Sequence, residues 1–363
     1  MIKIGNLSTD EFIILAAEKK VICFCAGQKF SELCEKYEEY ELVSHILYVV
    51  DNYEKGTEIA IKGKKIPVVS ASEMGKEAGN CILLITSMRY ADEMIFQLDE
   101  MSLCDGLTFY IPDLFRSDGG QFPLEHRGVQ KIPKSIHYCW FGKGKMPERF
   151  CKNIETWKKQ CPDYEIIRWD EENYDISKNQ YIRQAYEAGK WSFVSDYARV
   201  DIINENGGIY LDTDVEVLKS YDPLLQFDMF CGFETDRFVN FGIGFGAEKG
   251  NRVLEEILEL YRDLEFFRGD GTWNLVTSPL YQTEILNRHG LVGNGQTQIK
   301  EHIIILSPEY LSPVNPYGYG APTEKSFSVH QYAATWLDEK QKKEKGRLMR
   351  NYEYVMKRMG VKR

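Results

Sequence analysis

The sequence has no CxxC pair, no secretory-type leader pattern and no apolar run long enough to cross a bilayer. Its nine cysteines are an odd number without the spacing of a zinc ribbon or a dithiol redox centre. Most of them lie in apolar runs, as reduced cysteines of a cytosolic protein do. We therefore expect a soluble cytoplasmic protein.

Negative charge outnumbers positive charge except at one end of the chain. The 45 Lys and Arg residues against 55 Asp and Glu give a net charge of −10, which argues against a nucleic-acid partner. From Asp338 to Arg363, however, ten basic residues stand against four acidic ones. We expect this basic tail to be helical. It is a candidate for peripheral contact with anionic lipid at the inner face of the membrane, and a solvated helix is the alternative.

The length of 363 residues and the 43% hydrophobic content suit two folded domains of about 150 residues each. In residues 1–115, short apolar runs alternate with amphipathic stretches, which predicts a small parallel α/β sheet. Residues 116–130 are polar and contain glycine, as linkers do. We expect a second domain over 131–337, followed by the tail at 338–363.

The first domain carries only fragments of a nucleotide-binding pattern. Its first turn has one glycine, Gly27, where a dinucleotide fingerprint has three, although Asp51 ends the second predicted strand where a ribose-binding acid would stand. Turn formation by both residues is the favoured interpretation. The stretch from Val50 to Val69 resembles nucleotide-binding-like domains that accompany bacterial sugar-modifying enzymes. The role of residues 1–130 stays unassigned.

The most informative stretch runs from Ser192 to Lys219. A helical pattern ends at Asn206-Gly207-Gly208, and a buried strand then stops abruptly at Asp212-Thr213-Asp214. Side chains alternate along a strand, so Asp212 and Asp214 point to the same side with alpha carbons about 7 Å apart. Unit charges about 4 Å apart repel by about 4 kcal/mol at an effective dielectric of 20, and a divalent cation removes this cost. Solvated turn residues are the alternative.

Two further features have both a structural and a functional interpretation. Asp196 and Arg199 are neighbours on one helical face. They form either an exposed ion pair or a site for sugar hydroxyls and phosphate. Trp140 ends the predicted first strand of the second domain. It is either a core aromatic or a flat wall for a nucleobase.

Together these segments resemble the DXD-containing sugar transferases of glycosyltransferase family 32. Members are bacterial capsular or surface polysaccharide enzymes, related to fungal mannosyltransferases and to the glucosylating domains of clostridial toxins. The similarity spans about Lys131 to Trp336 and rests on IPKSIHYCWFG, WKKQCPDYEIIRWDEENYD, FVSDYARVDIINENGGIYLDTDVEVLKSYDPLL, FCGFE and SVHQYAATW. It implies an α/β fold class, with a GT-A-type (Rossmann-like) sugar transferase domain preceded by a small α/β nucleotide-binding-like domain.

The resemblance also implies roles for individual residues. The DXD acids and a late histidine would hold Mn²⁺ or Mg²⁺, with the ligand set Asp212, Asp214 and His330. The implied donor-binding residues are Trp140, Ser195, Asp196, Arg199, Tyr210, Asp212 and Trp336. The implied catalytic residues are Asp212, Asp214, Asp196, Arg199 and Asn240, the last as a candidate whose alternative is a turn asparagine. The chain departs from the family's usual residues at Ser278, Gln331 and Thr335.

The implied activity is metal-dependent transfer of a sugar from a nucleotide-sugar donor, expected to be a UDP-sugar, to a saccharide or lipid-linked acceptor. Retention of configuration and a place in capsule or other polysaccharide biosynthesis are also implied. The residues alone leave two alternatives open. One is a haloacid-dehalogenase-like phosphohydrolase with Asp212 as nucleophile, for which no convincing supporting lysine or later acidic pair is found. The other is a non-catalytic nucleotide-sugar-binding module.

Overall fold

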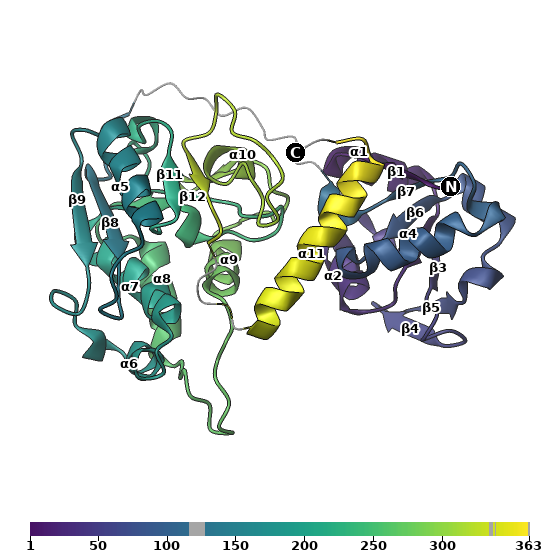
Figure 1. Ribbon diagram of the computed structural model, residues 1–363, viewed down its shortest axis with the longest axis horizontal. Coiled ribbons are helices and arrows are strands. Elements are labelled where there is room, and N and C mark those ends of the chain that lie inside the picture. The colour runs from purple at the N-terminus through teal and green to yellow at the C-terminus, as the bar shows by residue number, and fades with distance from the viewer. Residues whose placement is uncertain (116–127, 334–336, 338, 362–363) are drawn as a thin grey trace. The chain divides into compact units, whose positions relative to one another are not determined.

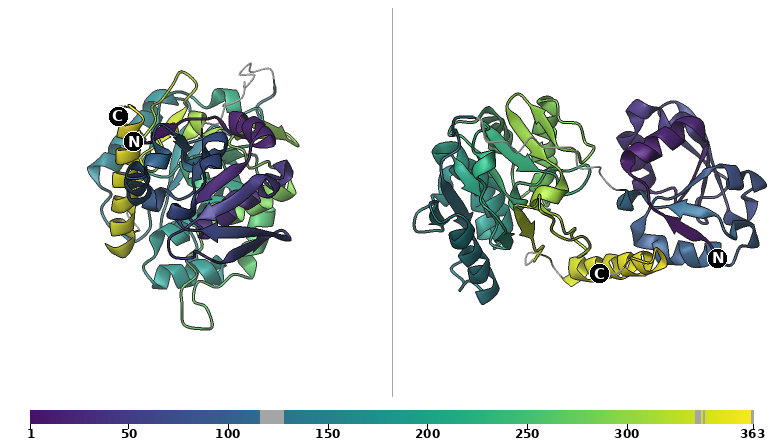
Figure 2. Two further views of the ribbon diagram at one scale, coloured as in Figure 1. Left: turned by 90° about the vertical axis from the view of Figure 1, so that its right-hand side faces the viewer. Right: turned by 90° about the horizontal axis from the view of Figure 1, so that it is seen from above.

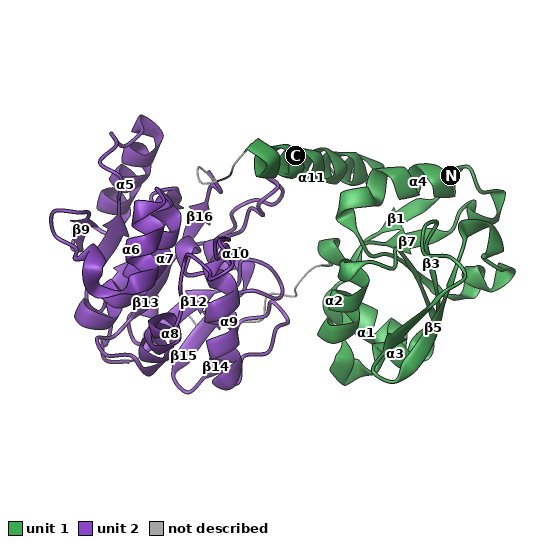
Figure 3. Cartoon of the chain, turned by 90° about the horizontal axis from the view of Figure 1, so that it is seen from below, with its two compact units in different colours: residues 1–118, 338–363 green, residues 119–337 purple. Residues whose placement is uncertain are grey.

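The computed structural model describes residues 1–115, 128–333, 337 and 339–361 (Figure 1). The chain divides into two compact units, residues 1–118 with 338–363 and residues 119–337 (Figure 3). Each unit is built on a seven-stranded sheet with helices on its faces (Figure 2). The predicted α/β class is therefore confirmed. Among the described residues, no helix combines the length and apolar character needed to cross a membrane.

The sheet of the first unit is a doubly wound, mostly parallel sheet. Its strand order is β1-β7-β6-β2-β3-β5-β4, and only the edge strand β4 runs antiparallel to its neighbour. The strands are β1 (Lys3–Gly5), β2 (Val21–Phe24), β3 (Ile46–Val50), β4 (Glu58–Ile61), β5 (Lys64–Val69), β6 (Ile82–Ile85) and β7 (Thr108–Tyr110). The helices are α1 (Thr9–Glu18), α2 (Gln28–Lys36), α3 (Leu42–His45) and α4 (Ala91–Asp99). The apolar, fully buried β2 and β6 form its centre, as expected of a covered parallel sheet.

Asp51 forms a turn in this unit. Its Oδ2 accepts a hydrogen bond from the Ala26 amide at 2.9 Å, and its Oδ1 accepts from the amides of Tyr53 and Glu54 at 2.9 and 3.2 Å. Both carboxylate oxygens are thus engaged by backbone donors. This is the turn-forming interpretation that the sequence favoured over a ribose contact.

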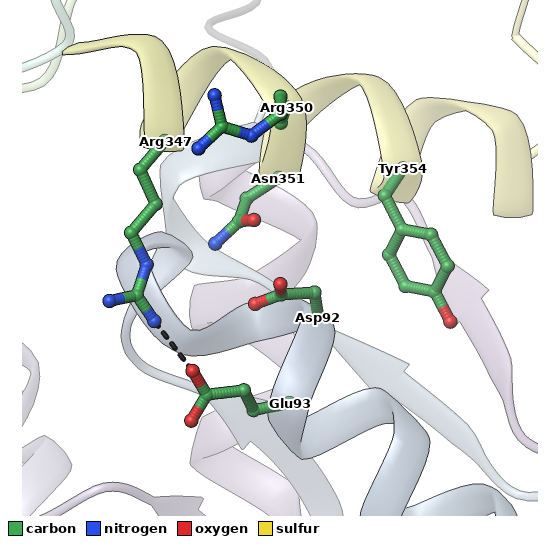
Figure 4. Close-up of a pocket in the computed structure, with 6 residues that line it drawn as sticks. All are labelled: Asp92, Glu93, Arg347, Arg350, Asn351 and Tyr354. Carbon is green, nitrogen blue, oxygen red and sulfur yellow. Dashed lines mark hydrogen bonds and ion pairs between the residues drawn. The ribbon is translucent and has the colours of Figure 1, made fainter. Parts of the chain in front are cut away.

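The C-terminal helix α11 (Glu339–Arg358) belongs to the first unit and is not a separate tail. It buries Tyr352 and Val355, and Arg358 pairs with Asp99 on α4 at 2.6 Å. Figure 4 shows the pocket between α4 and α11, where Arg347 pairs with Glu93 at 2.6 Å. These arginines of the basic segment are therefore committed to contacts within the protein.

The second unit has a mixed sheet of order β14-β15-β12-β13-β10-β8-β9. Its strands are β8 (Ser135–Cys139), β9 (Glu165–Trp169), β10 (Gly208–Tyr210), β12 (Met229–Gly232), β13 (Phe245–Ala247), β14 (Gln298–Lys300) and β15 (Ile303–Leu306). Two further strands, β11 (Val215–Val217) and β16 (Ser328–His330), form an antiparallel ribbon. The helices are α5 (Glu148–Gln160), α6 (Gln180–Glu187), α7 (Trp191–Asn206), α8 (Arg252–Arg262), α9 (Ser278–Arg288) and α10 (Pro308–Leu311).

Two apolar cores in this unit hold the helices against the sheet. One is formed with α6, α7, α8 and α9, and the other with α5 and α10. Helix α7 is buried on most sides, from Phe193 through Ile203. A helix that is apolar around most of its circumference is held in place from several directions. This fixes the polar residues that α7 carries toward the end of the neighbouring strand β10.

Candidate active site

The turn from α7 into β10 requires glycine. Gly207 and Gly208 have φ values of +70° and +103°, which side-chain-bearing residues rarely adopt. A Cβ on Gly208 would lie 2.2 Å from the Ser135 hydroxyl on β8. Strand β10 begins at Gly208 and pairs with β8 on one side and β13 on the other. The strand then ends at Tyr210, and the two acids of the DXD motif follow in the next loop.

Asp212, Asp214 and His330 come together as a candidate metal centre. One ligand atom from each residue lies within 4.8 Å of the others. The ribbon explains this, because Val215 and His330 face each other in its register, which places the imidazole beside Asp214. The His330 Nε2 lies 3.0 Å from Asp214 Oδ1, while its buried Nδ1 has no hydrogen-bond partner in the described part of the chain.

Arg199 is a buried bridge between two acids. Its Nη2 lies 3.1 Å from Asp212 Oδ1, and its Nη1 lies 3.0 Å from Asp196 Oδ1. The side chain is only 5% exposed, so this is not the exposed helix ion pair that was the structural alternative. Asp212 Oδ1 also accepts a hydrogen bond from the Tyr210 hydroxyl at 3.0 Å. The carboxylate is thereby fixed from two directions.

The chain of ion pairs Asp196–Arg199–Asp212 is held at Asp196 by α9. The hydroxyl of Ser278, the first residue of α9, donates to Asp196 Oδ1 at 2.9 Å. Burial raises the pKa of Asp196, and the charge of Arg199 opposes that rise. Ser195 does not join these ion pairs, because its hydroxyl donates to the Trp191 carbonyl one turn earlier at 3.1 Å.

The two DXD acids have different electrostatic environments. Burial raises the pKa of Asp212, the negative charge of Asp214 adds to this rise, and Arg199 opposes it. Burial raises the pKa of Asp214, but His330 and the backbone amide of Ala333 together bring it below its usual value. Reciprocally, burial lowers the pKa of His330 and the acids around it, Asp214 first, raise it above its usual value.

The site contains more negative charge than its own cations neutralise. Asp196, Asp212, Asp214 and Glu234 interact electrostatically with the single guanidinium of Arg199 and the imidazole of His330. With all four acids ionised and the imidazole protonated, these two cations leave two negative charges uncompensated among the described residues. Partly buried charges of one sign are costly unless they are paired or bind a metal. The donor set and this excess therefore fit a divalent cation.

Comparisons with known proteins match the segment that carries the two DXD acids. Residues 147–231, which include the DXD motif and all of α7, match the family described as a glycosyltransferase sugar-binding region containing a DXD motif. Inositol phosphoceramide mannosyltransferase 1 of Schizosaccharomyces pombe is 31% identical over 162 residues, which are 40% of this chain and 49% of that protein. Mannosyl phosphorylinositol ceramide synthase SUR1 of Saccharomyces cerevisiae is 32% identical over 105 residues, covering 28% and 27% of the two chains.

The chain thus spans about half the length of the first of these relatives and less of the second. Among solved structures, the PaToxG glycosyltransferase matches 44% of this chain and 69% of its own at 20% identity, with a TM-score of 0.38. The galactosyltransferase LgtC, solved with donor and acceptor sugar analogues, matches 58% and 95% at 14% identity, with a TM-score of 0.24.

The remaining residues implied by the family resemblance lie in different settings. Trp140 follows β8, where its Nε1 donates to the Gly144 carbonyl at 2.7 Å and its partly exposed ring lies 5.8 Å from that of Phe150. Tyr210 is 1% exposed and contacts Asp212 through its hydroxyl. Trp336 lies outside the described residues.

The structure adds two residues to which the sequence assigned no role. A Cβ on Gly242 would lie 2.5 Å from Asp212 Oδ2, so the backbone of Gly242 closes one side of the acid. Glu234 lies beside Asn240 and interacts electrostatically with His330. The available signal was that Glu234 is the last residue of the segment FCGFE, which contributes to the family resemblance.

Proposed function

We propose that this chain is a divalent-metal-dependent glycosyltransferase that moves a sugar from a nucleotide-sugar donor to a saccharide or lipid-linked acceptor. The convergence of Asp212, Asp214 and His330 within 4.8 Å carries the proposal. Two of these residues lie in the segment that matches the sugar-binding family. The same segment contains Asp196 and Arg199, the other pair expected at the donor.

In sugar transfer, the leaving group is the part of the donor that positive charge must stabilise. Breaking the anomeric C–O bond of the donor leaves a nucleoside diphosphate that gains negative charge in the transition state. A bound Mn²⁺ or Mg²⁺ supplies Lewis-acid stabilisation of that charge. Asp212, Asp214 and His330 are the residues that would hold the ion.

The chain's own residues then orient the donor. Arg199 holds Asp196 and Asp212 at fixed separation through buried ion pairs, so neither carboxylate moves freely when a ligand enters. Asp196 accepts hydrogen bonds from the hydroxyls of the transferred sugar, and Trp140 stacks on the donor base. Preorganised groups of this kind lower the reorganisation cost of the reaction.

The finer parts of the proposal rest on the family resemblance. They are a UDP-sugar as donor, transfer with retention of configuration, and a role in capsule or other surface polysaccharide biosynthesis on the cytoplasmic side of the membrane. The curated relatives are fungal enzymes whose names specify mannosyl transfer to inositol phosphoceramide or synthesis of the mannosylated lipid. A mannose donor therefore belongs in any substrate screen.

The test is a screen of nucleotide-sugars for release of nucleoside diphosphate with added Mn²⁺, repeated after chelation with EDTA. We expect turnover with one donor class, loss on chelation, and recovery on return of Mn²⁺. Glu256→Gln, which removes a carboxylate on α8 outside the cluster, is the matched control and should retain wild-type turnover. Hydrolysis of a generic phosphomonoester without nucleotide-sugar turnover would contradict the proposal, as would donor binding without any Mn²⁺-dependent turnover.

A further inference from the structure

Glu234 and Asn240 are brought together by a short hairpin next to the candidate metal centre. The hairpin leaves β12, its strands bridge at Phe233 and Val239, and the Glu234 amide donates to the Phe238 carbonyl at 2.8 Å. Across it, the Asn240 Nδ2 donates to Glu234 Oε1 at 3.1 Å. The other end of the same amide, Oδ1, accepts from the Gly242 backbone at 2.7 Å.

These two neighbours determine which way the Asn240 amide points. A backbone N–H only donates, so Oδ1 must face Gly242, and Nδ2 at the other end of the amide then faces Glu234. In the described part of the chain, Nδ2 makes that one hydrogen bond. An amide nitrogen carries two hydrogens, so the second remains for a ligand.

The Asn240 amide lies close to Asp212 and Arg199, around the backbone of Gly242. A Cβ on Gly242 would lie 3.0 Å from Asn240 Oδ1, 2.5 Å from Asp212 Oδ2 and 3.3 Å from Arg199 Nη1. The backbone at Gly242 therefore lies against the Asn240 amide oxygen, a DXD acid and the buried guanidinium, with no room for a further methyl group. A group fixed at this place is close enough to contact a sugar held by the neighbouring residues.

Glu234 has a second hydrogen-bond partner, Tyr332. The hydroxyl of Tyr332 hydrogen-bonds the Glu234 carboxylate and also lies 2.6 Å from the Ser312 hydroxyl. The Tyr332 ring packs edge-on against His330 with centroids 4.2 Å apart. Glu234 thus joins the hairpin to the segment that carries the histidine of the metal centre.

We propose that Glu234 is a positioning residue that orients Asn240, so that the remaining Nδ2 hydrogen donates to a hydroxyl of the transferred sugar. This inference rests on the proposed function. It assigns Asn240 the substrate contact and Glu234 the control of its orientation. A residue that only stabilised the hairpin would need no particular direction for that hydrogen bond.

Reversing the direction of the hydrogen bond separates these two roles. In the double variant Glu234→Gln with Asn240→Asp, the new side-chain amide at position 234 donates to the new carboxylate at position 240, which still accepts from the Gly242 amide. The contacts that hold the hairpin are restored, but the side chain at position 240 has no N–H left for a sugar. We expect the thermal midpoint to return to the wild-type value, while kcat stays about 10-fold or more below wild type, the effect of about 1.4 kcal/mol of lost transition-state stabilisation.

The single variants complete a double-mutant cycle for Glu234 and Asn240. Glu234→Gln should lower kcat about 10-fold with little change in the donor KM, and in an Asn240→Ala background the same substitution should change kcat less than about twofold. Recovery of kcat together with the thermal midpoint in the reversed pair would overturn the inference, since Glu234 would then be structural. Failure of the reversed pair to recover its thermal midpoint, or additive effects of the single substitutions, would overturn it too. Absence of turnover in the wild type would instead contradict the proposed function.

Discussion

The imidazole of His330 lies 3.0 Å from the Asp214 carboxylate because Val215 and His330 face each other in the β11–β16 ribbon. The segment that follows extends this contact, since the Gln331 amide donates to the Asp214 carbonyl and the Ala333 amide donates to Asp214 Oδ2, both at 2.9 Å. One acid of the DXD motif therefore organises the chain around the histidine. Substitutions here should affect metal binding and local structure together.

Asp214→Asn should lower the transfer rate by several orders of magnitude. The amide removes a negative charge from the ligand set and loses the ion pair with His330, and each 1.4 kcal/mol of lost transition-state stabilisation is about tenfold in rate. Calorimetric titration with Mn²⁺ should show weaker binding in the variant. A folded Asp214→Asn protein with wild-type turnover in Mn²⁺ would remove this residue from the mechanism.

Arg199→Met should destabilise the second unit. It removes the cation between Asp196 and Asp212 and leaves two partly buried carboxylates without their partner, at a cost of about 3 kcal/mol. Urea denaturation should show a lower midpoint with an unchanged slope. The exposed Arg252, which pairs with the half-buried Glu256 on α8, provides the control, because Arg252→Met should change the midpoint very little. Equal shifts of the urea midpoint in the two variants would contradict the interpretation that burial makes the Arg199 ion pairs more stabilising.

Gly242→Ala should impair the site more than the fold. The added Cβ would lie 2.5 Å from Asp212 Oδ2, so the acid or the backbone must shift. We expect weaker Mn²⁺ binding and a large loss of turnover, measured by calorimetry and by nucleoside diphosphate release. Gly269→Ala, where a Cβ meets nothing within 4 Å, is the matched control and should behave as wild type. Unchanged Mn²⁺ affinity in Gly242→Ala would show that Asp212 tolerates the displacement.

The free energy of unfolding should fall in acid because His137 becomes protonated. Burial lowers the pKa of His137 to about 4, and its Nδ1 accepts a hydrogen bond from the Trp169 indole at 3.0 Å, which a protonated ring cannot do. Because the unfolded chain binds the proton near pH 6.5, this contribution is complete above that pH and is lost as the pH falls toward 4. Its full size is about 3 kcal/mol. His137→Gln should reduce the slope of unfolding free energy against pH between about 7 and 4.5, and an unchanged slope would contradict the assignment.

Val355→Asp should destabilise the first unit alone. The valine is fully buried where α11 packs on this unit, and a charge placed there loses its hydration without gaining a partner. Hydrogen exchange resolved by segment should show faster exchange in α4 and β1, with the second unit unchanged. Lys340→Asp, at an exposed position of the same helix, should leave exchange as in the wild type. Equal protection in both variants would mean that α11 does not support this unit.

Local patterns in the sequence predicted the parts of the site that depend on local geometry. The end of α7 at Asn206, the glycine turn and the strand that stops before Asp212 follow from residues adjacent in the chain. The same is true of the proximity of Asp196 and Arg199 on one helical face. Short-range spacing carries this information because helices and strands have fixed periods.

Contacts between distant segments could not be obtained in this way. His330 was nominated only through the family resemblance, because its position beside Asp214 depends on the register of two strands far apart in the chain. Glu234 received no role, since its proximity to His330 needs two separate loops to meet. The burial of Tyr210 and the packing of α11 on the first unit likewise depend on tertiary contacts.

The first unit uses residues from both sides of the second, 1–118 and 338–363. During synthesis, all of residues 119–337 therefore leave the ribosome before helix α11 is available to cover Ile2, Met88 and their neighbours. Domains generally fold as units when their sequence is complete. Translation order thus favours a nascent chain in which the second unit folds first, because the first unit is complete only after α11 has been made.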